Sequence, residues 1–365
     1  MDQKQIAALA RDAGFSQAGI APVPPLGEDY PESNHFEDWI ARGHAGEMEY
    51  LKRRDQDGNL LRSSLRVPIP WARSVIVCAA NYNADAPKST DHASPESAWI
   101  ARYAWTGYGS GKPSDYHDVL LARLKNLDHT LQQRLGPFQS RCYVDTGPLV
   151  ERVYARYAGI GWIGKNTCLL DQKLGSWLFL GVIITALDLP AVPVKLPEDR
   201  CGSCTRCLDA CPTGALVAPY HMDASLCIAY LTIEKRGSIP EPLRPQIGRQ
   251  VFGCDICQDV CPWNRRAPVS GDTELAVRRE LVNPALAWLA ELDAEGFRTW
   301  FRQSPVQRTR LSGFLRNVAI AMGNSGLKAY LPKLQEWAVG PDPVLAEAAQ
   351  WAAARLLAAE PDPAP

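Results

Sequence analysis

The feature that most constrains this chain is a concentration of cysteine. Eight of its eleven cysteines lie between Cys201 and Cys261, several only two or three residues apart. Disulfide frameworks are typical of secreted chains with a leader segment. The N-terminal residues contain no apolar leader, and the longest apolar run, 177–187, is far shorter than the roughly 18 residues of a membrane span. We therefore expect a cytoplasmic protein with reduced thiols that bind metal.

The spacing Cys-x2-Cys-x2-Cys-x3-Cys-Pro at the start of this region is that of bacterial ferredoxins. In those proteins three thiolates hold one 4Fe-4S cluster and the fourth crosses to a second cluster. One outlying cysteine and a later Cys-x2-Cys-x3-Cys-Pro run complete a second set. The crossing rule then predicts two sets of ligands, which are Cys201, Cys204, Cys207 and Cys261 for one cluster and Cys211, Cys227, Cys254 and Cys257 for the other.

Other interpretations of the cysteines are open at this point. Zinc also takes four thiolates, although Cys-x2-Cys-x2-Cys is not its usual pairing. The clusters could also be structural elements of a nucleic-acid-binding protein, but two clusters with crossed ligands suit electron transfer better. For Cys78, Cys142 and Cys168, which have apolar neighbours, we predict ordinary buried core thiols.

The length of 365 residues predicts two or three domains. The patterns along the chain divide it into three, with an α+β fold class. Residues 1–190 mix strand and helix patterns and are expected to form an α/β domain. Prolines 190, 193 and 197 mark a linker into a ferredoxin-like domain at 191–268. Residues 269–360 have helical patterns throughout, and they predict either a HEAT-like hairpin or a three-helix cap.

Within the first domain, hydrophobic patterns predict three strands and one long helix. Apolar runs indicate strands at 74–80, 141–144 and 177–187. Leucines at helical spacing indicate a helix over 115–135.

Two clusters imply a terminal electron acceptor, usually flavin, nicotinamide or corrinoid. No Gly-x-Gly-x-x-Gly motif follows a predicted strand, and the glycines at 107, 109 and 111 are interpreted as a loop. The run Asp115-Tyr116-His117 approaches the Asp-x-His-x-x-Gly motif that ligates corrinoid cobalt, but it lacks the glycine. We therefore interpret His117 as a helix-start residue rather than a cobalt ligand.

Together with the cysteine pattern, several motifs resemble the epoxyqueuosine reductase family, over about residues 46 to 326. They are Arg102-Tyr103-Ala104, Asp115-Tyr116-His117, Val144-Asp145-Thr146-Gly147-Pro148, Gly161-Trp162-Ile163-Gly164-Lys165-Asn166, the segment from Cys227 to Thr232, and Phe252-Gly253-Cys254-Asp255. The resemblance implies a cobalamin-binding α/β domain, a ferredoxin-like domain with two 4Fe-4S clusters and, in some members, a HEAT-like segment. One departure is the insertion 105–114, which is expected to alter the rim of the pocket.

The resemblance further implies that the protein catalyses the last step of queuosine synthesis. In that step an epoxide on a modified guanine in a tRNA anticodon becomes an alkene, and its oxygen leaves as water. Asp145 matches the family's proton donor, a role that requires Tyr143, Val144 and the cofactor face to raise its pKa. By residue type alone, Asp145 would be a turn residue before Gly147.

The resemblance also implies the residues that contact cobalamin, several of them through backbone atoms. They are Arg54, Tyr103, Asp145, Leu169, Leu180, Ile228, Cys254 and Asp255. By side chain alone, the two leucines and the isoleucine would be core residues. Because no histidine is a clear ligand, we predict base-off cobalamin without a protein imidazole on cobalt.

A tRNA substrate requires a basic surface, yet 39 Lys+Arg against 40 Asp+Glu exclude a uniformly basic coat. Residues 296–335 contain five arginines, two lysines and no acidic residue. We predict phosphate contacts in this stretch and just after the Cys227 segment. The predicted residues are Lys235, Arg236, Arg308, Arg310 and Arg316.

The remaining expectations concern partners and alternative functions. We expect an external electron donor such as a flavodoxin or ferredoxin, and a monomeric chain. The main alternative is a corrinoid and iron–sulfur reductase of a small molecule, similar to reductive dehalogenases, which would have no use for the basic stretch. A non-enzymatic nucleic-acid binder with structural clusters is a third class.

Overall fold

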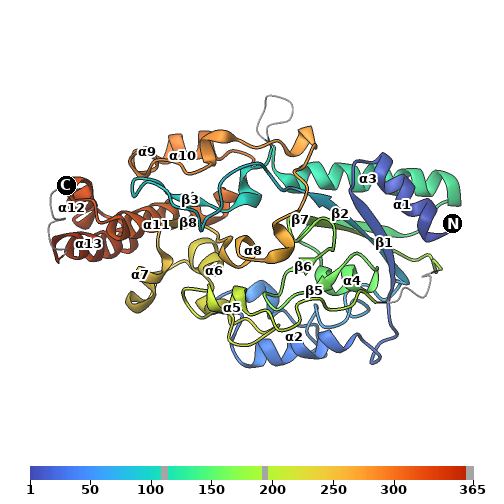
Figure 1. Cartoon of the computed structure of the whole chain (residues 1–365). Helices are drawn as coiled ribbons and strands as arrows, with labels where there is room; N and C mark the ends of the chain where they lie inside the picture. Colours follow the sequence, from blue (N-terminus) through green and yellow to red (C-terminus); the bar gives the residue numbers. More distant parts are fainter. Residues whose placement is uncertain (108–113, 191–195, 359–365) are drawn as a thin grey trace.

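A four-stranded antiparallel sheet organises the N-terminal half of the molecule (Figure 1). The computed structural model describes residues 1–107, 114–190 and 196–358. In the order in which they pair, the strands are β1 (Gln17–Pro22), β2 (Ser74–Asn81), β7 (Leu178–Thr185) and β4 (Ser140–Tyr143). The three strands predicted from the sequence are confirmed, with ends that shift by at most two residues.

The sheet is covered by helices on both faces, which explains the apolar character of its central strands. Along β2, Ile76 and Cys78 face the core beneath α1 (Gln3–Asp12) and α3 (Tyr116–Leu135). The alternate residues Val75 and Val77 face α4 (Glu151–Tyr157), beyond which lies α2 (Pro31–Ala41). Because successive side chains of a strand point to opposite faces, a strand covered on both faces is apolar at every position.

The segment from Ser97 to Thr106 leaves this sheet and joins the C-terminal half. β3 (Trp99–Ile100) pairs in parallel with β8 (Gln250–Phe252), and the fully buried Trp99 and Trp105 share one hydrophobic core with the C-terminal helices. A residue range predicted for the first domain therefore contributes to a later core. The division at 190 and 268 stays a prediction.

Short helices carry the cysteine region, and longer helices complete the chain. They are α5 (Arg206–Asp209), α6 (Ile228–Ile233), α7 (Arg244–Ile247), α8 (Ile256–Asp259), α9 (Leu286–Ala290), α10 (Ala294–Trp300), α11 (Arg310–Ser325), α12 (Leu331–Ala338) and α13 (Pro343–Ala358). A small hairpin pairs β5 (Trp162–Ile163) with β6 (Leu169–Leu170).

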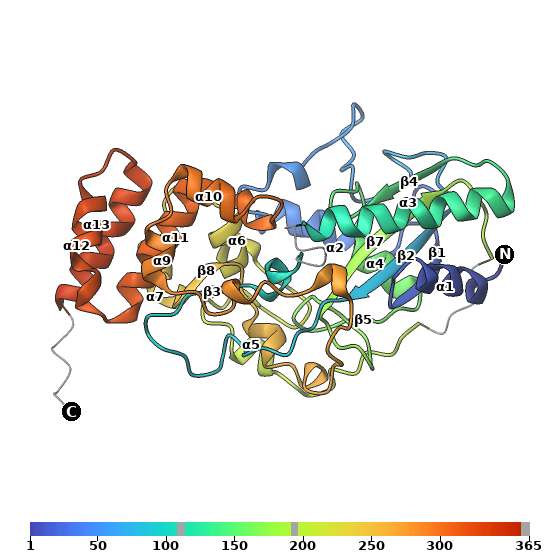
Figure 2. The same ribbon diagram turned by 90° about the horizontal axis from the view of Figure 1, so that it is seen from above.

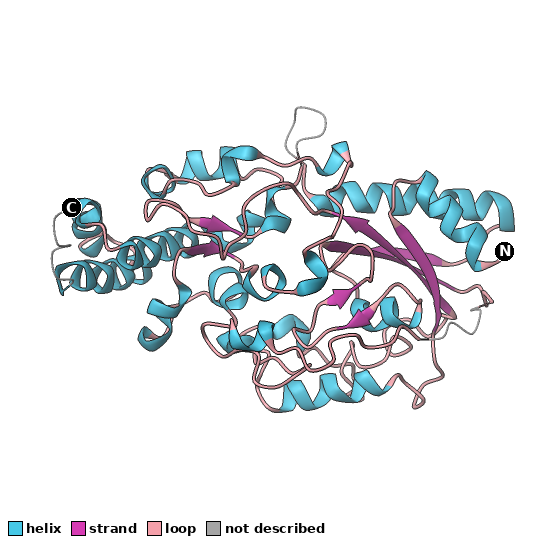
Figure 3. Cartoon of the chain, in the orientation of Figure 1, coloured by secondary structure: helices cyan, strands magenta, loops and turns pink. Residues whose placement is uncertain are grey.

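Strands are concentrated towards the N-terminal end, and helices form the opposite end (Figure 3). The last helices, α11, α12 and α13, pack together at the C-terminal end of an elongated molecule (Figure 2). The mainly helical character predicted beyond residue 273 is confirmed, and the choice between a HEAT-like hairpin and a three-helix cap stays open. Within the described ranges, no helix is long and apolar enough to cross a membrane.

Candidate active site

The clustered cysteines lie on two short helices and the loops around them, in the middle of the molecule (Figure 1). Cys207 belongs to α5 and Cys257 to α8, and the two helices pack against each other. In both runs the next cysteine is followed by proline, which ends the short helical turn. The two similar turns therefore bring cysteines distant in sequence into one region.

One group of thiols consists of neighbours from both runs. Burial raises the pKa of Cys261 to about 11, and Cys201 and Cys207 contribute to the rise. Burial also raises the pKa of Cys207, with contributions from Cys201 and Cys204. The late cysteine Cys261 thus lies among three cysteines of the first run.

A second group of neighbouring thiols contains the other four cysteines of the region. Burial raises the pKa of Cys254 well above its usual range, and Cys227 and Cys211 raise it further. Cys257 lies within electrostatic reach of Cys254 and Cys227. The outlying Cys227 is therefore brought to this group, at the residue that precedes α6.

Cys168 differs from the prediction of an ordinary core thiol. It lies after the β5 strand, and the Cys168 and Cys257 thiols influence each other's pKa. It also lies within electrostatic reach of Cys227 and Cys261, one thiol from each group. By contrast, Cys78 is fully buried in β2 as predicted. No local sequence pattern around Cys168 announces its contacts, because they come from the distant α8 region.

The loop between β5 and β6 binds the backbone of both cysteine runs. Lys165 Nζ donates to the carbonyl of Cys204 at 3.0 Å, and Asn166 Nδ2 donates to the carbonyl of Cys257 at 3.3 Å. Gly161 is required beside this loop, because a Cβ there would lie 2.1 Å from the carbonyl oxygen of Leu170. This loop thus holds the cysteine region against the sheet domain.

Asp145 forms a polar centre at the end of β4. Its φ of 57° is a left-handed conformation that non-glycine residues seldom adopt, and such residues are concentrated at functional sites. Its side chain is 49% exposed, accepts a hydrogen bond from the Tyr116 hydroxyl and lies 3.7 Å from His117 Nε2. The flanking Val144 is buried, and Tyr143 is half-buried.

His117 lies in the first turn of α3, as predicted. Its Nδ1 lies 2.6 Å from Asp115 Oδ1, and the same carboxylate caps the helix by accepting from the His117 backbone N–H. Burial opposes a charge on the ring, but the Asp115 carboxylate outweighs it and raises the pKa of His117. Both ring nitrogens therefore face carboxylates.

Tyr103 lies between Asp145 and the second cysteine group. Burial raises its pKa well above the usual range, and the Asp145 and Asp255 carboxylates raise it further. Asp255 follows Cys254 and is buried, and its Oδ2 accepts from Trp99 Nε1 at 3.0 Å and from the Arg102 backbone N–H at 2.7 Å.

The other residues predicted to line cobalamin are more dispersed. Leu169 and Leu180 share the buried core between the sheet and α4. Ile228 belongs to the core of the C-terminal helices. Arg54 is exposed and donates to the Gly58 carbonyl at 2.6 Å.

Predicted tRNA-binding cations gather where the end of α6 meets the start of α11. Arg236 Nη1 donates to the backbone carbonyl of Arg308 at 2.7 Å, and Arg308 forms an ion pair with Glu234. Lys235 lies beside them, and Arg310 is exposed at the first position of α11.

These cations border the Asp145 site. The Arg308 guanidinium lies 5.3 Å from the centre of the Tyr50 ring and within electrostatic reach of Tyr103. Lys235 forms an ion pair with Glu47. The basic residues are therefore partly neutralised by carboxylates in this structure.

The prediction that Arg316 contacts tRNA is wrong. Its side chain is only 1% exposed and donates to the carbonyls of Leu231, Lys235 and Gly237 and to Asn317 Oδ1. A guanidinium enclosed in this way is not available to a phosphate. Arg316 instead fixes α11 against the segment that carries Lys235.

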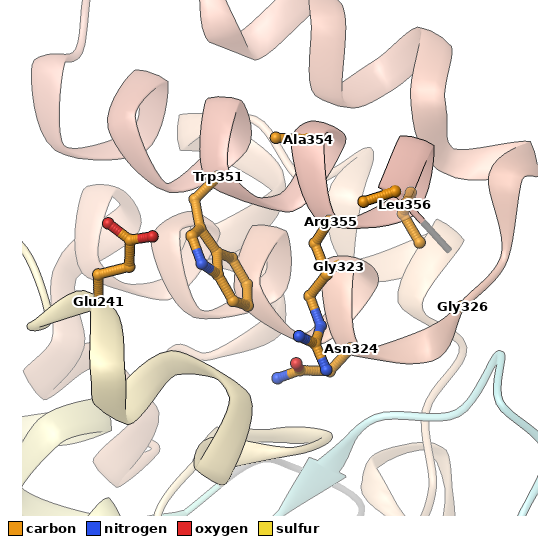
Figure 4. A pocket seen from close by; sticks show the side chains of 9 residues that line it. Glu241, Gly323, Asn324, Gly326, Trp351, Ala354, Arg355 and Leu356 are labelled. Carbon is orange, nitrogen blue, oxygen red and sulfur yellow. The ribbon is translucent and has the colours of Figure 1, made fainter. Parts of the chain in front are cut away.

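Two further features lie apart from this site. A cavity of about 550 Å³ at the C-terminal end is lined by residues of α11 and α13 and by Glu241 (Figure 4), and none of the predicted site residues is among those lining it. The predicted insertion at 105–114 falls largely on residues 108–113, which are outside the described residues. Trp105, at its start, is fully buried.

Two regions of the chain, the cysteine region and the segment that ends just after Asp145, match known protein families. The sequence model of a "4Fe-4S double cluster binding domain" matches residues 200–264, and that of "Epoxyqueuosine reductase QueG, DUF1730" matches residues 62–146. Epoxyqueuosine reductase of Pseudomonas aeruginosa is 41% identical over 320 residues, which cover 86% of this chain and 83% of that protein. Epoxyqueuosine reductase of Escherichia coli is 36% identical, over 95% of this chain and 87% of that protein.

Solved structures are similar over nearly the whole chain. One is an epoxyqueuosine reductase with an epoxyqueuosine-modified stem loop of a tyrosine tRNA, at 28% identity and a TM-score of 0.82, covering 97% of this chain and 89% of that one. Another, from Bacillus subtilis, has its catalytic aspartate loop swung out of the active site. It has 28% identity and a TM-score of 0.82, and covers 97% of this chain and 90% of that one.

Proposed function

The chain belongs to the epoxyqueuosine reductase family, and we propose that it reduces epoxyqueuosine to queuosine at the anticodon wobble position of tRNA. The observation that carries this proposal is the position of Asp145. Its carboxyl lies within electrostatic reach of Tyr103, and so does that of Asp255, the residue that follows Cys254. A proton donor therefore lies at the end of a cysteine region suited to electron transfer, and reduction of an epoxide to an alkene and water requires both electrons and protons.

Two 4Fe-4S clusters, which the matched double-cluster domain implies, would supply electrons one at a time. We assign Cys201, Cys204, Cys207 and Cys261 to one cluster and Cys211, Cys227, Cys254 and Cys257 to the other. The two groups of neighbouring thiols support this division, since each contains cysteines from both runs. An external carrier such as a flavodoxin or ferredoxin would deliver the electrons, and the chain would act as a cytoplasmic monomer.

Cobalamin is the cofactor that the family implies between the clusters and the substrate. Once bound, it would supply a low-valent cobalt that gathers two electrons at the substrate. The donor set fits a cofactor without a protein imidazole, because both nitrogens of His117 face carboxylates. The residues that would hold it are Arg54, Tyr103, Asp145, Leu169, Leu180, Ile228, Cys254 and Asp255.

The chain's own contribution to the chemistry is proton supply at Asp145. Breaking a carbon–oxygen bond of the epoxide leaves charge on the oxygen, and a positioned acid beside it lowers the barrier. The Tyr116 hydroxyl orients the Asp145 carboxyl by donating to its Oδ2.

Binding of tRNA would use the cations that border this site. We assign phosphate contacts to Lys235, Arg236, Arg308 and Arg310. Their position near Tyr103 supports this assignment, because a modified base in the site would bring its backbone phosphates to the surrounding rim. Ion pairs with Glu47 and Glu234 would exchange for phosphate on binding.

The decisive experiment is turnover of epoxyqueuosine tRNA by the purified, anaerobically reconstituted protein. Nucleoside analysis should show queuosine forming at the expense of epoxyqueuosine, with about eight irons per chain as two four-iron clusters require. A strain that lacks the protein should accumulate epoxyqueuosine. If the loaded protein leaves this tRNA unchanged but reduces small halogenated or epoxide compounds, the small-molecule alternative is correct.

A further inference from the structure

Glu151 is a buried carboxyl directly behind Asp145, and the reaction as described above does not use it. It lies at the first position of α4, and its carboxyl is within hydrogen-bonding distance of the Asp145 carboxyl. Among the described residues, nothing hydrogen-bonds to its buried Oε1. A carboxylate with a buried, unpartnered oxygen is strongly unfavourable, whereas a protonated carboxyl is tolerated.

A tight turn holds the two carboxyl groups together. Asp145 has its left-handed backbone, the Thr146 N–H donates to the Val144 carbonyl at 2.6 Å, and a Cβ at Gly147 would lie 2.5 Å from Leu149 Cδ2. The chain therefore folds back immediately after β4 and enters α4 with Glu151 beneath Asp145. The strain at Asp145 indicates that the surrounding structure imposes this contact.

The groups around Glu151 favour its protonated form. Tyr116 donates to Asp145, and His117 Nε2 lies 3.7 Å from Asp145 Oδ2. Burial raises the pKa of Glu151 well above its usual range and the Asp145 carboxylate raises it further, while Arg62 opposes the shift. Glu151 is therefore a carboxyl that can hold a proton beside Asp145.

We propose that Glu151 is a positioning residue for Asp145 that also holds the second proton of the reaction. The inference rests on the function proposed above, in which the epoxide oxygen gains two protons and two electrons and leaves as water. Asp145 gives its proton to the oxygen when the first carbon–oxygen bond breaks. The O–H bond of Glu151 then breaks as a new O–H bond forms on Asp145, and Asp145 delivers this second proton to the same oxygen.

This relay explains the asymmetry of the pair. Asp145 is half-exposed and can reach the substrate, whereas Glu151 is less exposed and its Oε1 is buried. The charge left on Glu151 after transfer is within electrostatic reach of Arg62. Solvent then returns two protons to the pair by way of Asp145 once product has left.

The test is Glu151→Gln, which keeps the size of the side chain and a donor towards Asp145 but cannot release a proton. We expect kcat to fall about 100-fold, as for loss of a proton-transfer group, with little change in KM for tRNA. The alkaline limb of the pH profile of kcat should move to lower pH, because the variant lacks the buried Glu151 carboxyl, whose pKa lies well above its usual range. Glu151→Asp should restore part of kcat.

A matched control is Glu32→Gln. Glu32 forms an ion pair with Arg156 on the same helix α4 but lies outside the Asp145 site, so its pH profile should be that of the wild type. Infrared titration of the cofactor-free protein gives a readout independent of activity. Burial raises the pKa of Asp255 to about 7, so the spectrum of each variant is subtracted from that of the wild type at neutral pH. The difference should contain a protonated carboxyl band for Glu151→Gln and none for Glu32→Gln.

Two results would overturn the relay. One is a Glu151→Gln enzyme with wild-type kcat and an unmoved alkaline limb. The other is a variant that loses activity together with melting temperature and retains the wild-type pH profile and carboxyl band, which would make Glu151 purely structural. A wild-type enzyme that fails to reduce epoxyqueuosine tRNA would instead contradict the proposed function, and the infrared result would still report on the carboxyl pair.

Discussion

Arg316 and Arg310 lie on the same helix, and the structure gives them opposite roles. Arg316 is enclosed and donates to the carbonyls of Leu231, Lys235 and Gly237 as well as to Asn317. Replacement by methionine keeps most of the side-chain volume and removes all of these donors. We expect Arg316→Met to lower stability and Arg310→Met to lower tRNA affinity.

The expected destabilisation of Arg316→Met depends on how deeply each acceptor of the guanidinium is buried. The Leu231 carbonyl and Asn317 Oδ1 are buried, and an unsatisfied buried acceptor costs about 1–3 kcal/mol, or about 2–6 kcal/mol for the two. The Lys235 and Gly237 carbonyls are only partly buried, so water can replace the guanidinium there. Burial lowers the pKa of Arg316 to about 10, which shows that its charge is held at a cost that methionine removes.

Because these effects oppose each other, we expect the free energy of unfolding to fall by about 2–3 kcal/mol, near the lower end of that range. At about 2–4 °C per kcal/mol for a unit of 150–250 residues, the melting temperature should fall by roughly 4–12 °C. The assay is circular dichroism of the anaerobic, cluster-loaded protein at one scan rate, because unfolding of a cluster protein is not expected to be reversible.

Arg310→Met is the matched control, since the described structure shows no hydrogen bond or ion pair of the Arg310 side chain. It should melt like the wild type, bind tRNA more weakly and reduce the slope of log affinity against log salt by about one. Arg316→Met should leave that slope unchanged when measured well below its melting temperature. If Arg316→Met melts with the wild type and flattens the salt dependence as Arg310→Met does, Arg316 reaches phosphate and its assignment as a buried structural residue is incorrect.

Three further substitutions test other parts of the structure. Asp145→Asn should reduce turnover of epoxyqueuosine tRNA at least 100-fold at full cofactor loading, as expected for a general acid, and turnover within a few-fold of wild type would exclude that role. Cys261→Ser should lower the iron content from about eight to about four per chain, whereas the buried Cys78→Ser should retain both clusters, as anaerobic iron analysis would show. Gly19→Ala should yield little soluble protein, because its Cβ would lie 2.0 Å from a backbone carbonyl oxygen at the end of α4, and normal yield and melting temperature would contradict this packing.

Elements whose signal is local could be predicted from the sequence. The strand β2 is predicted by an apolar run, and the helix α3 by the spacing of its leucines. Each of these signals is contained in a short stretch of sequence. The ferredoxin spacing is local in the same sense. The outlying Cys227 also lies near Cys211 and Cys254, in the set to which the crossing rule assigns it.

Features that depend on tertiary contacts could not be predicted in this way. A count of charges along residues 296–335 does not distinguish the exposed start of α11 from its enclosed middle, so Arg316 was grouped with Arg310. Helical periodicity contained the missing information, because Arg316 lies between the buried Phe314 and Val318. For Cys168 no equivalent signal exists, since its partner Cys257 is supplied by a remote turn.

The site brings together residues that the sequence assigned to different predicted domains. The segment that carries Trp99, Arg102 and Tyr103 is N-terminal in sequence, but β3 pairs with β8 and its tryptophans enter the C-terminal core. Through this segment Asp255 receives hydrogen bonds from Trp99 and from the Arg102 backbone, and Tyr103 is placed between Asp255 and Asp145. The distance from the cysteine region to Asp145, the proposed proton donor, is therefore set by the packing of the helical half against the sheet. Loosening that core should separate the proposed electron and proton supplies even with every site residue intact.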